Sequence, residues 1–214
     1  FLIRNIDFVN LKPYFNKDEP YLLEETLISK NPFELFDAWF KNAAAGENLT
    51  FEEVNARFLL SNSSLCFMGF CFYTHYNSAK GMEIDANPCA CMLFYWPHVN
   101  RQIRIEGKIQ KLPIEAADVY WYRRPLKSRI GSKLSEQSKV IPGRQYLEER
   151  KKELERLATE KGEASITRPE DWGGYRLCPN YFEFWQGQSD RIHDRIVFDK
   201  NNSEDSWLIK RLSP

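Results

Sequence analysis

The chain has 214 residues and carries 30 Lys and Arg against 30 Asp and Glu, so its formal net charge at pH 7 is zero. Binding to nucleic acids or acidic membranes usually depends on a positive field, and the balanced charge argues against both roles. An aromatic content of 14% predicts one well-packed globular domain, which we place at residues 31–214 behind an extended N-terminal arm at residues 1–30 that could cover a partner subunit.

The cysteines and the few histidines narrow the class of protein further. The five cysteines are odd in number and mostly lie in apolar runs, which favours buried free thiols and a reducing compartment. With three His and no CxxC or HExxH motif, no metal site is expected. The apolar opening is interrupted by Arg4, Asp7 and Lys12 well before membrane-spanning length, which predicts a soluble, cytoplasmic protein.

A helix is predicted at the start of the domain. Asn31 has the residue type of an N-cap, Pro32 suits the first helical position, and Glu34 occupies the capping-box position. The helix should end near Gly46. Its apolar residues recur at the spacing of one core-facing stripe, namely Phe33, Phe36, Trp39, Phe40 and Ala43.

Strands dominate the next part of the chain. Two apolar runs at 57–60 and 65–74 are separated by Ser61-Asn62-Ser63-Ser64, which indicates a tight connection. The run from Cys89 to Trp96 is continuously apolar, as is typical of a strand buried on both faces. Residues 101–111 alternate, and the residues expected to face inward are Ile103, Ile105 and Ile109.

The remaining elements complete the expected fold. A short helix should end at Asn87, and further helices are predicted at 113–122, 128–134 and 142–160. Strands are predicted at 174–177, 181–186, 194–198 and 206–212. This order predicts a mainly β protein with peripheral helices (α+β), built around a closed or partly closed barrel.

The stretch Phe184–Arg195, FWQGQSDRIHDR, concentrates aromatic and basic residues. If it is one extended strand, Arg191, His193 and Arg195 share a face, because side chains alternate along a strand. Such a row of donors beside Trp185 suits an anionic ligand that contains a ring. A solvated edge strand whose charges pair with their neighbours explains the pattern equally well.

This stretch resembles the C-terminal signature of the pyridoxine (pyridoxamine) 5′-phosphate oxidases, together with Trp172-Gly173-Gly174-Tyr175 and Arg211-Leu212-Ser213-Pro214. The likeness extends in several blocks from about Asn31 to Pro214. It implies an FMN-binding split β-barrel and a homodimer with FMN between the subunits. It also implies oxidation of pyridoxamine or pyridoxine 5′-phosphate to pyridoxal 5′-phosphate, with hydride transfer from C4′ to flavin N5 and reduction of O2 to H2O2.

The resemblance also implies the site residues. Those expected to contact FMN are Arg57, Phe58, Leu59, Leu60, Tyr73, Thr74, Lys80, Gln102, Gln137, Ser138, Trp185 and Arg195. The family's Tyr-x-x-x-Arg-Pro-x-x-Ser block, which holds the substrate phosphate, corresponds to Tyr120, Arg124 and Ser128. Arg191 and His193 would lie over the substrate ring as the catalytic residues, and His193 would handle any proton.

This chain also departs from the family pattern. Asn62 stands where the family has a phosphate-binding Lys, and Ala79 stands where it has an Arg. Before Arg57 the family carries a strand and a turn that this chain lacks. The retained substrate residues favour an active oxidase. The departures favour the alternative, a non-catalytic split-barrel protein that binds flavin or pyridoxal phosphate, or that pairs with an intact relative.

Overall fold

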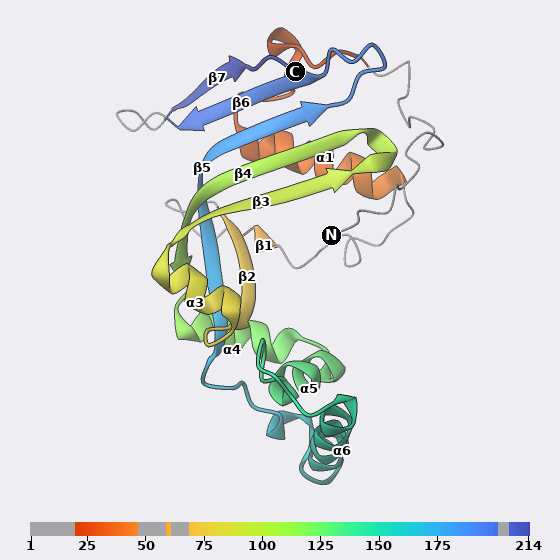
Figure 1. Cartoon of the computed structure of the whole chain (residues 1–214), viewed down its shortest axis with the longest axis vertical. Helices are drawn as coiled ribbons and strands as arrows, with labels where there is room; N and C mark the ends of the chain where they lie inside the picture. Colours follow the sequence, from red (N-terminus) through yellow and green to blue (C-terminus); the bar gives the residue numbers. More distant parts are fainter. Residues whose placement is uncertain (1–19, 47–58, 61–68, 201–205) are drawn as a thin grey trace, which may run out of the picture. The chain divides into compact units, whose positions relative to one another are not determined.

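The computed structural model describes residues 20–46, 59–60, 69–200 and 206–214 (Figure 1). Four of the expectations concern residues outside these ranges. They are the FMN contacts at Arg57 and Phe58, the departure at Asn62, the turn at 61–64 and the missing strand before Arg57. The described strands form one seven-stranded sheet in the order β1-β2-β5-β4-β3, with β6 paired to β5 and β7 to β6. A sheet with flanking helices confirms the expected α+β class.

The chain divides into two compact units. The first comprises residues 1–55, 91–105 and 180–214, and the second comprises residues 56–90 and 106–179. In the part of the chain that the structure describes, no helix is long and apolar enough to span a bilayer.

Helix α1 (Pro32–Gly46) opens the first unit as predicted. The side-chain oxygen of Asn31 accepts a hydrogen bond from the Phe33 N–H at 3.0 Å, so Asn31 is the N-cap. The Asn31 N–H donates to the hydroxyl of Ser29 at 2.9 Å, so Ser29 fills the role expected for Glu34. The whole predicted apolar stripe is buried.

The stripe of α1 packs on the sheet of its own unit. Phe33 meets Phe182 edge-on with ring centroids 5.1 Å apart, and Trp39 meets Phe184 at 5.2 Å. This part of the sheet contains the end of β5 (Trp172–Gln186), β6 (Asp194–Lys200) and β7 (Trp207–Arg211), paired antiparallel. The unit also contains two 3-10 helices, η2 (Glu24–Thr26) and η3 (Pro97–Val99).

Strand β3 (Cys89–Trp96) forms where predicted, but the expected burial on both faces is wrong within one chain. Phe94 packs on α1, whereas Leu93 and Tyr95 are 59% and 58% exposed. Because side chains alternate along a strand, α1 covers the face that carries Phe94, and the face that carries Leu93 and Tyr95 is open in the single chain. Cys89 and Cys91 are exposed free thiols, contrary to the expectation of burial, while Cys71 is buried.

The second unit contains β1 (Leu59–Leu60) and β2 (Phe70–His75), and β2 pairs antiparallel with the first part of β5. Strand β4 (Arg101–Lys111) belongs to the first unit up to Ile105 and to the second unit from Glu106, and it alternates as predicted, with its three isoleucines buried. The helices are α3 (Ala79–Ala86), α4 (Ile114–Arg123), α5 (Leu126–Leu134) and α6 (Arg144–Lys161), with η4 (Glu163–Ser165).

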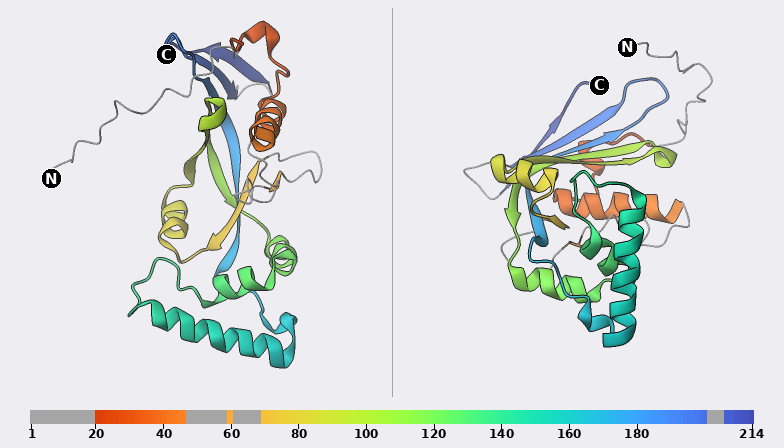
Figure 2. Two further views of the ribbon diagram at one scale, coloured as in Figure 1. Left: turned by 90° about the vertical axis from the view of Figure 1, so that its right-hand side faces the viewer. Right: turned by 60° about the horizontal axis from the view of Figure 1, so that its bottom comes forward.

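Helices α5 and α6 lie side by side in both sets of views (Figures 1 and 2). They enclose a small core with α4 and the start of β5. Its buried members are Trp121, Ile130, Ala158, Ile166 and Trp172. This core fixes α5 beside the end of β2.

We predict opposite effects from two glycine-to-alanine substitutions. At Gly107 in β4, an added Cβ would collide with the carbonyl group of Cys178, whereas nothing lies within 4 Å of a Cβ added at Gly131 in α5. Gly107→Ala should lower the free energy of unfolding by about 1–3 kcal/mol through overpacking. Gly131→Ala should raise it by up to about 1 kcal/mol through helix propensity. Equal effects in urea unfolding would contradict the close packing of β4 on β5.

Candidate active site

A hydrogen-bonded group at the end of β2 joins three residues expected to contact FMN. The Thr74 hydroxyl, which is buried, donates to Oε1 of Gln137 at 2.7 Å. It accepts from Nζ of Lys80 at 3.1 Å. We call Thr74, Lys80 and Gln137 the Thr74 cluster. The three residues come from β2, α3 and the segment after α5, so the fold assembles this group from separate parts of the chain.

The hydrogen-bonding state of Gln137 defines what this cluster can bind. Its Oε1 also accepts a longer bond, 3.4 Å, from the backbone N–H of His75. Because a carbonyl oxygen has two lone pairs, its acceptor capacity is used. The structure shows no partner among the described residues for the side-chain NH2 group, which remains as a donor. Ser138 follows with a left-handed backbone, φ 69°, and is exposed.

The turn after β2 places Lys80 beside Thr74. Ser78 is the N-cap of α3, accepting from the Gly81 N–H at 3.2 Å and donating to the carbonyl oxygen of His75 at 2.7 Å. A Cβ on Gly81 would collide with the carbonyl group of Tyr76, so the first turn of α3 lies against the end of β2.

The residues assigned to the substrate phosphate lie around an aromatic stack. Tyr73 stacks on Tyr120 with ring centroids 3.9 Å apart and on Trp172 at 5.3 Å. The Arg124 guanidinium lies 5.0 Å from the Trp172 ring and donates to the Ser132 hydroxyl at 2.9 Å. Burial raises the pKa of Tyr73 to about 12, so its hydroxyl stays neutral at physiological pH. Ser128 lies in α5.

His75 is a buried residue of this region that the sequence interpretation missed. Its ring nitrogens lie 3.0 Å from a carboxylate oxygen of Asp171 and 2.9 Å from the carbonyl oxygen of Ser132. The only sequence signal for it is a titratable residue at the end of an apolar strand, directly after Thr74.

In the first unit, the interpretation of Phe184–Arg195 as one extended strand is wrong, whereas the boundaries of the separately predicted strands 181–186 and 194–198 are confirmed on either side of the loop. Strand β5 ends at Gln186 and β6 begins at Asp194. Arg191 lies in the connecting loop with φ 71°, and the Asp190 carboxylate accepts from the Ile192 N–H at 2.9 Å, as in an Asx turn. The expected row of three donors on one strand face therefore does not form.

His193 and Trp185 nevertheless come together. Their ring centroids lie 5.0 Å apart. The backbone N–H of Gln188 lies 3.0 Å from Nδ1 of His193, so Nδ1 is the acceptor. A neutral His193 ring then carries its hydrogen on Nε2. Arg191 is exposed in the same loop.

Arg195 is held by a carboxylate and by the chain end. Its Nε and Nη2 each lie 2.7 Å from Oε1 of Glu183, and its Nη1 donates to the carbonyl oxygen of Ser213 at 2.9 Å. The hydrogen bond to Glu183 raises the pKa of the Arg195 guanidinium. Trp185 lies opposite Arg195 in the strand register. Gln102 is half-buried in β4.

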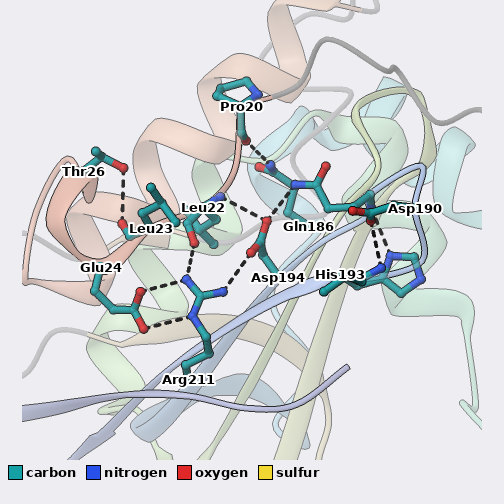
Figure 3. A network of polar contacts seen from close by, with 12 residues as sticks. Pro20, Leu22, Leu23, Glu24, Thr26, Gln186, Asp190, His193, Asp194 and Arg211 are labelled. Atoms are coloured by element: carbon teal, nitrogen blue, oxygen red, sulfur yellow. Dashed lines mark hydrogen bonds and ion pairs between the residues drawn. The ribbon is translucent and has the colours of Figure 1, made fainter.

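Figure 3 shows the contacts that hold the loop before β6. Asp194, which is 5% exposed, accepts from the side chain of Gln188 at 2.7 Å, from Nη1 of Arg211 at 2.8 Å and from the N–H of Leu22 at 3.1 Å. Arg211 also pairs with both carboxylate oxygens of Glu24, at 3.0 and 2.7 Å. We call these five residues the Asp194 network. It ties the described end of the N-terminal segment to the hairpin that carries Arg191 and His193.

We expect Glu24→Gln to lower the melting temperature in a pH-dependent way. The hydrogen bond from Arg211 lowers the pKa of Glu24, so the stabilisation is present at neutral pH and is lost as the pH falls through the lowered pKa. The difference between wild type and Glu24→Gln should therefore disappear in acid. Glu25→Gln is the matched control, because Glu25 has no ion pair among the described residues. A deficit of constant size at every pH would contradict the ion-pair explanation.

Comparison with known proteins identifies the family. The sequence matches the family described as "Pyridoxamine 5'-phosphate oxidase" over residues 65–157. It matches the "Pyridoxine 5'-phosphate oxidase C-terminal dimerisation region" over residues 172–214. A Caenorhabditis elegans protein, named provisionally as a pyridoxamine 5′-phosphate oxidase, is 53% identical and covers 98% of each chain. Bos taurus pyridoxine-5′-phosphate oxidase is 39% identical, over 92% of this chain and 84% of that protein.

Two solved structures support the fold. PhzG from Burkholderia lata 383, in complex with tetrahydrophenazine-1-carboxylic acid, is 26% identical with a TM-score of 0.74, covering 93% of this chain and 100% of that one. A Nostoc punctiforme FMN-binding protein related to pyridoxamine 5′-phosphate oxidase is 15% identical with a TM-score of 0.61, covering 87% and 100%. These matches confirm the expected split β-barrel. The chain therefore belongs to the pyridoxine (pyridoxamine) 5′-phosphate oxidase family.

Proposed function

We propose that this protein is an FMN-dependent oxidase that converts pyridoxamine and pyridoxine 5′-phosphate into pyridoxal 5′-phosphate while reducing O2 to H2O2. The observation that carries the proposal is the Thr74 cluster. Three residues that the family likeness assigns to the flavin, Thr74, Lys80 and Gln137, are joined by hydrogen bonds although they lie up to 63 positions apart.

The donors of the Thr74 cluster fit the chemistry of FMN. The Lys80 ammonium is a charged donor suited to a phosphate, and the Gln137 NH2 group suits a carbonyl oxygen or ring nitrogen of the flavin. In the first unit, Trp185 offers an aromatic surface and Arg195 a guanidinium already oriented by Glu183. When bound, FMN would supply the two-electron acceptor that amino-acid side chains lack.

The substrate phosphate would be bound by Tyr120, Arg124 and Ser128. Arg124 is suited to this role because its planar guanidinium can donate two parallel hydrogen bonds to a phosphate. Its position against Trp172 and its bond to Ser132 restrict its orientation, so little conformational freedom would be lost on binding.

Arg191 and His193 would orient the substrate ring as the catalytic residues. Because Nδ1 of His193 accepts from the backbone, Nε2 is the atom that would donate a hydrogen bond to a substrate heteroatom. His193 then acts first as a donor, and any proton it transfers would pass through Nε2. The loop position of Arg191 allows its side chain to approach a bound substrate without moving a strand.

A homodimer and a cytoplasmic location complete the proposal. The family's dimerisation region covers β5, β6 and β7. Strand β3 leaves an apolar face exposed at Leu93 and Tyr95, which a second copy of the chain would cover. Sedimentation should show a dimer at micromolar concentration.

Turnover with FMN added tests the function directly. The purified protein should show a flavin absorption band near about 450 nm. With pyridoxamine 5′-phosphate, O2 and water it should form pyridoxal 5′-phosphate, ammonia and H2O2 in equal amounts. A flavin band without turnover would favour the non-catalytic binding protein, for which Ala79, exposed and uncharged at the start of α3, is the supporting observation. Oxidation of a different substrate instead would place the chain nearer to enzymes such as PhzG.

Substitution of two arginines should separate cofactor binding from substrate binding. Arg195→Ala should weaken FMN retention by roughly tenfold to a hundredfold, because it removes charged hydrogen bonds worth about 1.5–3 kcal/mol each. Arg191→Ala should retain FMN and raise the KM for the substrate by a similar factor. If both variants lost FMN equally, the assignment of separate roles would be wrong.

Restoring the cation missing at Ala79 should tighten FMN binding. Ala79→Arg adds a guanidinium beside Lys80 and should lower the FMN dissociation constant by roughly tenfold, the value of one charged hydrogen bond. Ala86→Arg, at the opposite end of the same helix, adds the same charge away from the Thr74 cluster and serves as the control. Equal changes in the two variants would show that only net charge matters.

A further inference from the structure

The imidazole of His75 connects three elements of the second unit. The residue is 5% exposed and ends β2. Its Nδ1 lies 3.0 Å from Asp171, which precedes β5, and its Nε2 lies 2.9 Å from the carbonyl oxygen of Ser132 in α5. Both partner atoms are acceptors, so each ring nitrogen must carry a hydrogen for both contacts to be hydrogen bonds.

The backbone of His75 belongs to the Thr74 cluster. Its N–H points to Oε1 of Gln137 at 3.4 Å, and its carbonyl oxygen accepts from Ser78, the N-cap of the helix that carries Lys80. A shift of this one residue would therefore change the positions of Gln137 and Lys80 together.

The side chain of His75 reaches the proposed phosphate site of the substrate. Its Nε2 contacts the carbonyl oxygen of Ser132. The hydroxyl of the same serine accepts a hydrogen bond from Nη1 of Arg124 at 2.9 Å. Ser128 lies one helical turn earlier in the same helix. His75 thus connects the flavin-binding residues to the residues assigned to the substrate phosphate through a single intervening residue.

We propose that His75, together with Asp171, is a positioning residue that fixes the Thr74 cluster relative to Arg124, so that affinity for FMN and affinity for the substrate phosphate depend on the same side chain. The proposal rests on the proposed function for the identity of the two ligands. His75 acts through Gln137 and Ser132, and it touches neither ligand itself.

The test compares four variants. His75→Leu removes both hydrogen bonds and keeps an apolar side chain in the buried position. Asp171→Asn removes the charge at a side chain that is 38% exposed and so should fold normally. His75→Gln retains a donor for one of the two acceptors. His98→Leu is the control, because it removes a histidine hydrogen bond, to the carbonyl oxygen of Ala43, in the first unit.

FMN dissociation constants are measured by quenching of flavin fluorescence, and KM and kcat are measured with pyridoxamine 5′-phosphate at saturating FMN. His75→Leu should raise both the FMN dissociation constant and the KM by about tenfold, as expected for two lost hydrogen bonds. The kcat should stay within about twofold, because the catalytic residues are unchanged. His75→Gln and Asp171→Asn should give intermediate values, and His98→Leu should match wild type.

Two results would overturn the proposal. One is a lower melting temperature in His75→Leu or Asp171→Asn with both affinities unchanged, which would make the role of His75 structural only. The other is loss of affinity for one ligand alone, which would show that the two sites are not connected.

If His75→Leu fails to fold, the affinities of Asp171→Asn and His75→Gln test the proposal instead. If wild type binds FMN without turnover, the proposed function fails, while the FMN constants still test His75.

Discussion

The hydrogen bond from the Thr74 hydroxyl to Gln137 is the interaction on which the candidate site depends. It connects the end of β2 to a segment 63 positions later, and the same hydroxyl accepts from Lys80. One buried hydroxyl therefore orders the two side chains that we propose to contact the flavin. The hydroxyl also occupies the acceptor oxygen of Gln137 and leaves the amide NH2 group as a donor. In the proposed site this donor would recognise an acceptor atom of the ligand.

The second constraint is the Asp194 network. A buried carboxylate is costly unless it is paired, and Asp194 is satisfied by a guanidinium, an amide and a backbone N–H. Because one of these donors is Gln188, the conformation of the loop that presents His193 is determined from outside the loop. The loop is thus connected to Leu22 near the start of the described chain and to Arg211 near its end.

Features set by neighbouring residues could be predicted from the sequence. Helix α1 follows from the Asn31 cap and its apolar stripe, and β4 follows from the alternation of its isoleucines. The strand boundaries on either side of the loop between β5 and β6, Gln186 and Asp194, agree with the predicted strands. The interpretation of Phe184–Arg195 as one extended strand failed because alternating charges fit a strand as well as a turn, although Gly187, Ser189 and Asp190 are turn-forming residues. Strand β5 was predicted as two strands because Pro179 interrupts the pattern, yet the strand continues through it.

Contacts between distant segments could not be predicted from local patterns. No residue near Thr74 in the sequence identifies Gln137 as its partner. The family resemblance indicates each of the two positions as a flavin contact, but it does not indicate that a hydrogen bond joins them. The role of His75 was not anticipated at all, because its partners Asp171 and Ser132 are 96 and 57 positions away. The partners of Thr74 and of His75 are determined by tertiary packing between distant segments, which local sequence patterns do not reveal.

A crystal structure of the protein with FMN bound would test the central claim most directly. The account predicts that the flavin contacts the side-chain NH2 group of Gln137 and the ammonium of Lys80, with Thr74 still bonded to Gln137. Flavin bound away from the Thr74 cluster, or a cluster whose hydrogen bonds break on binding, would contradict the account.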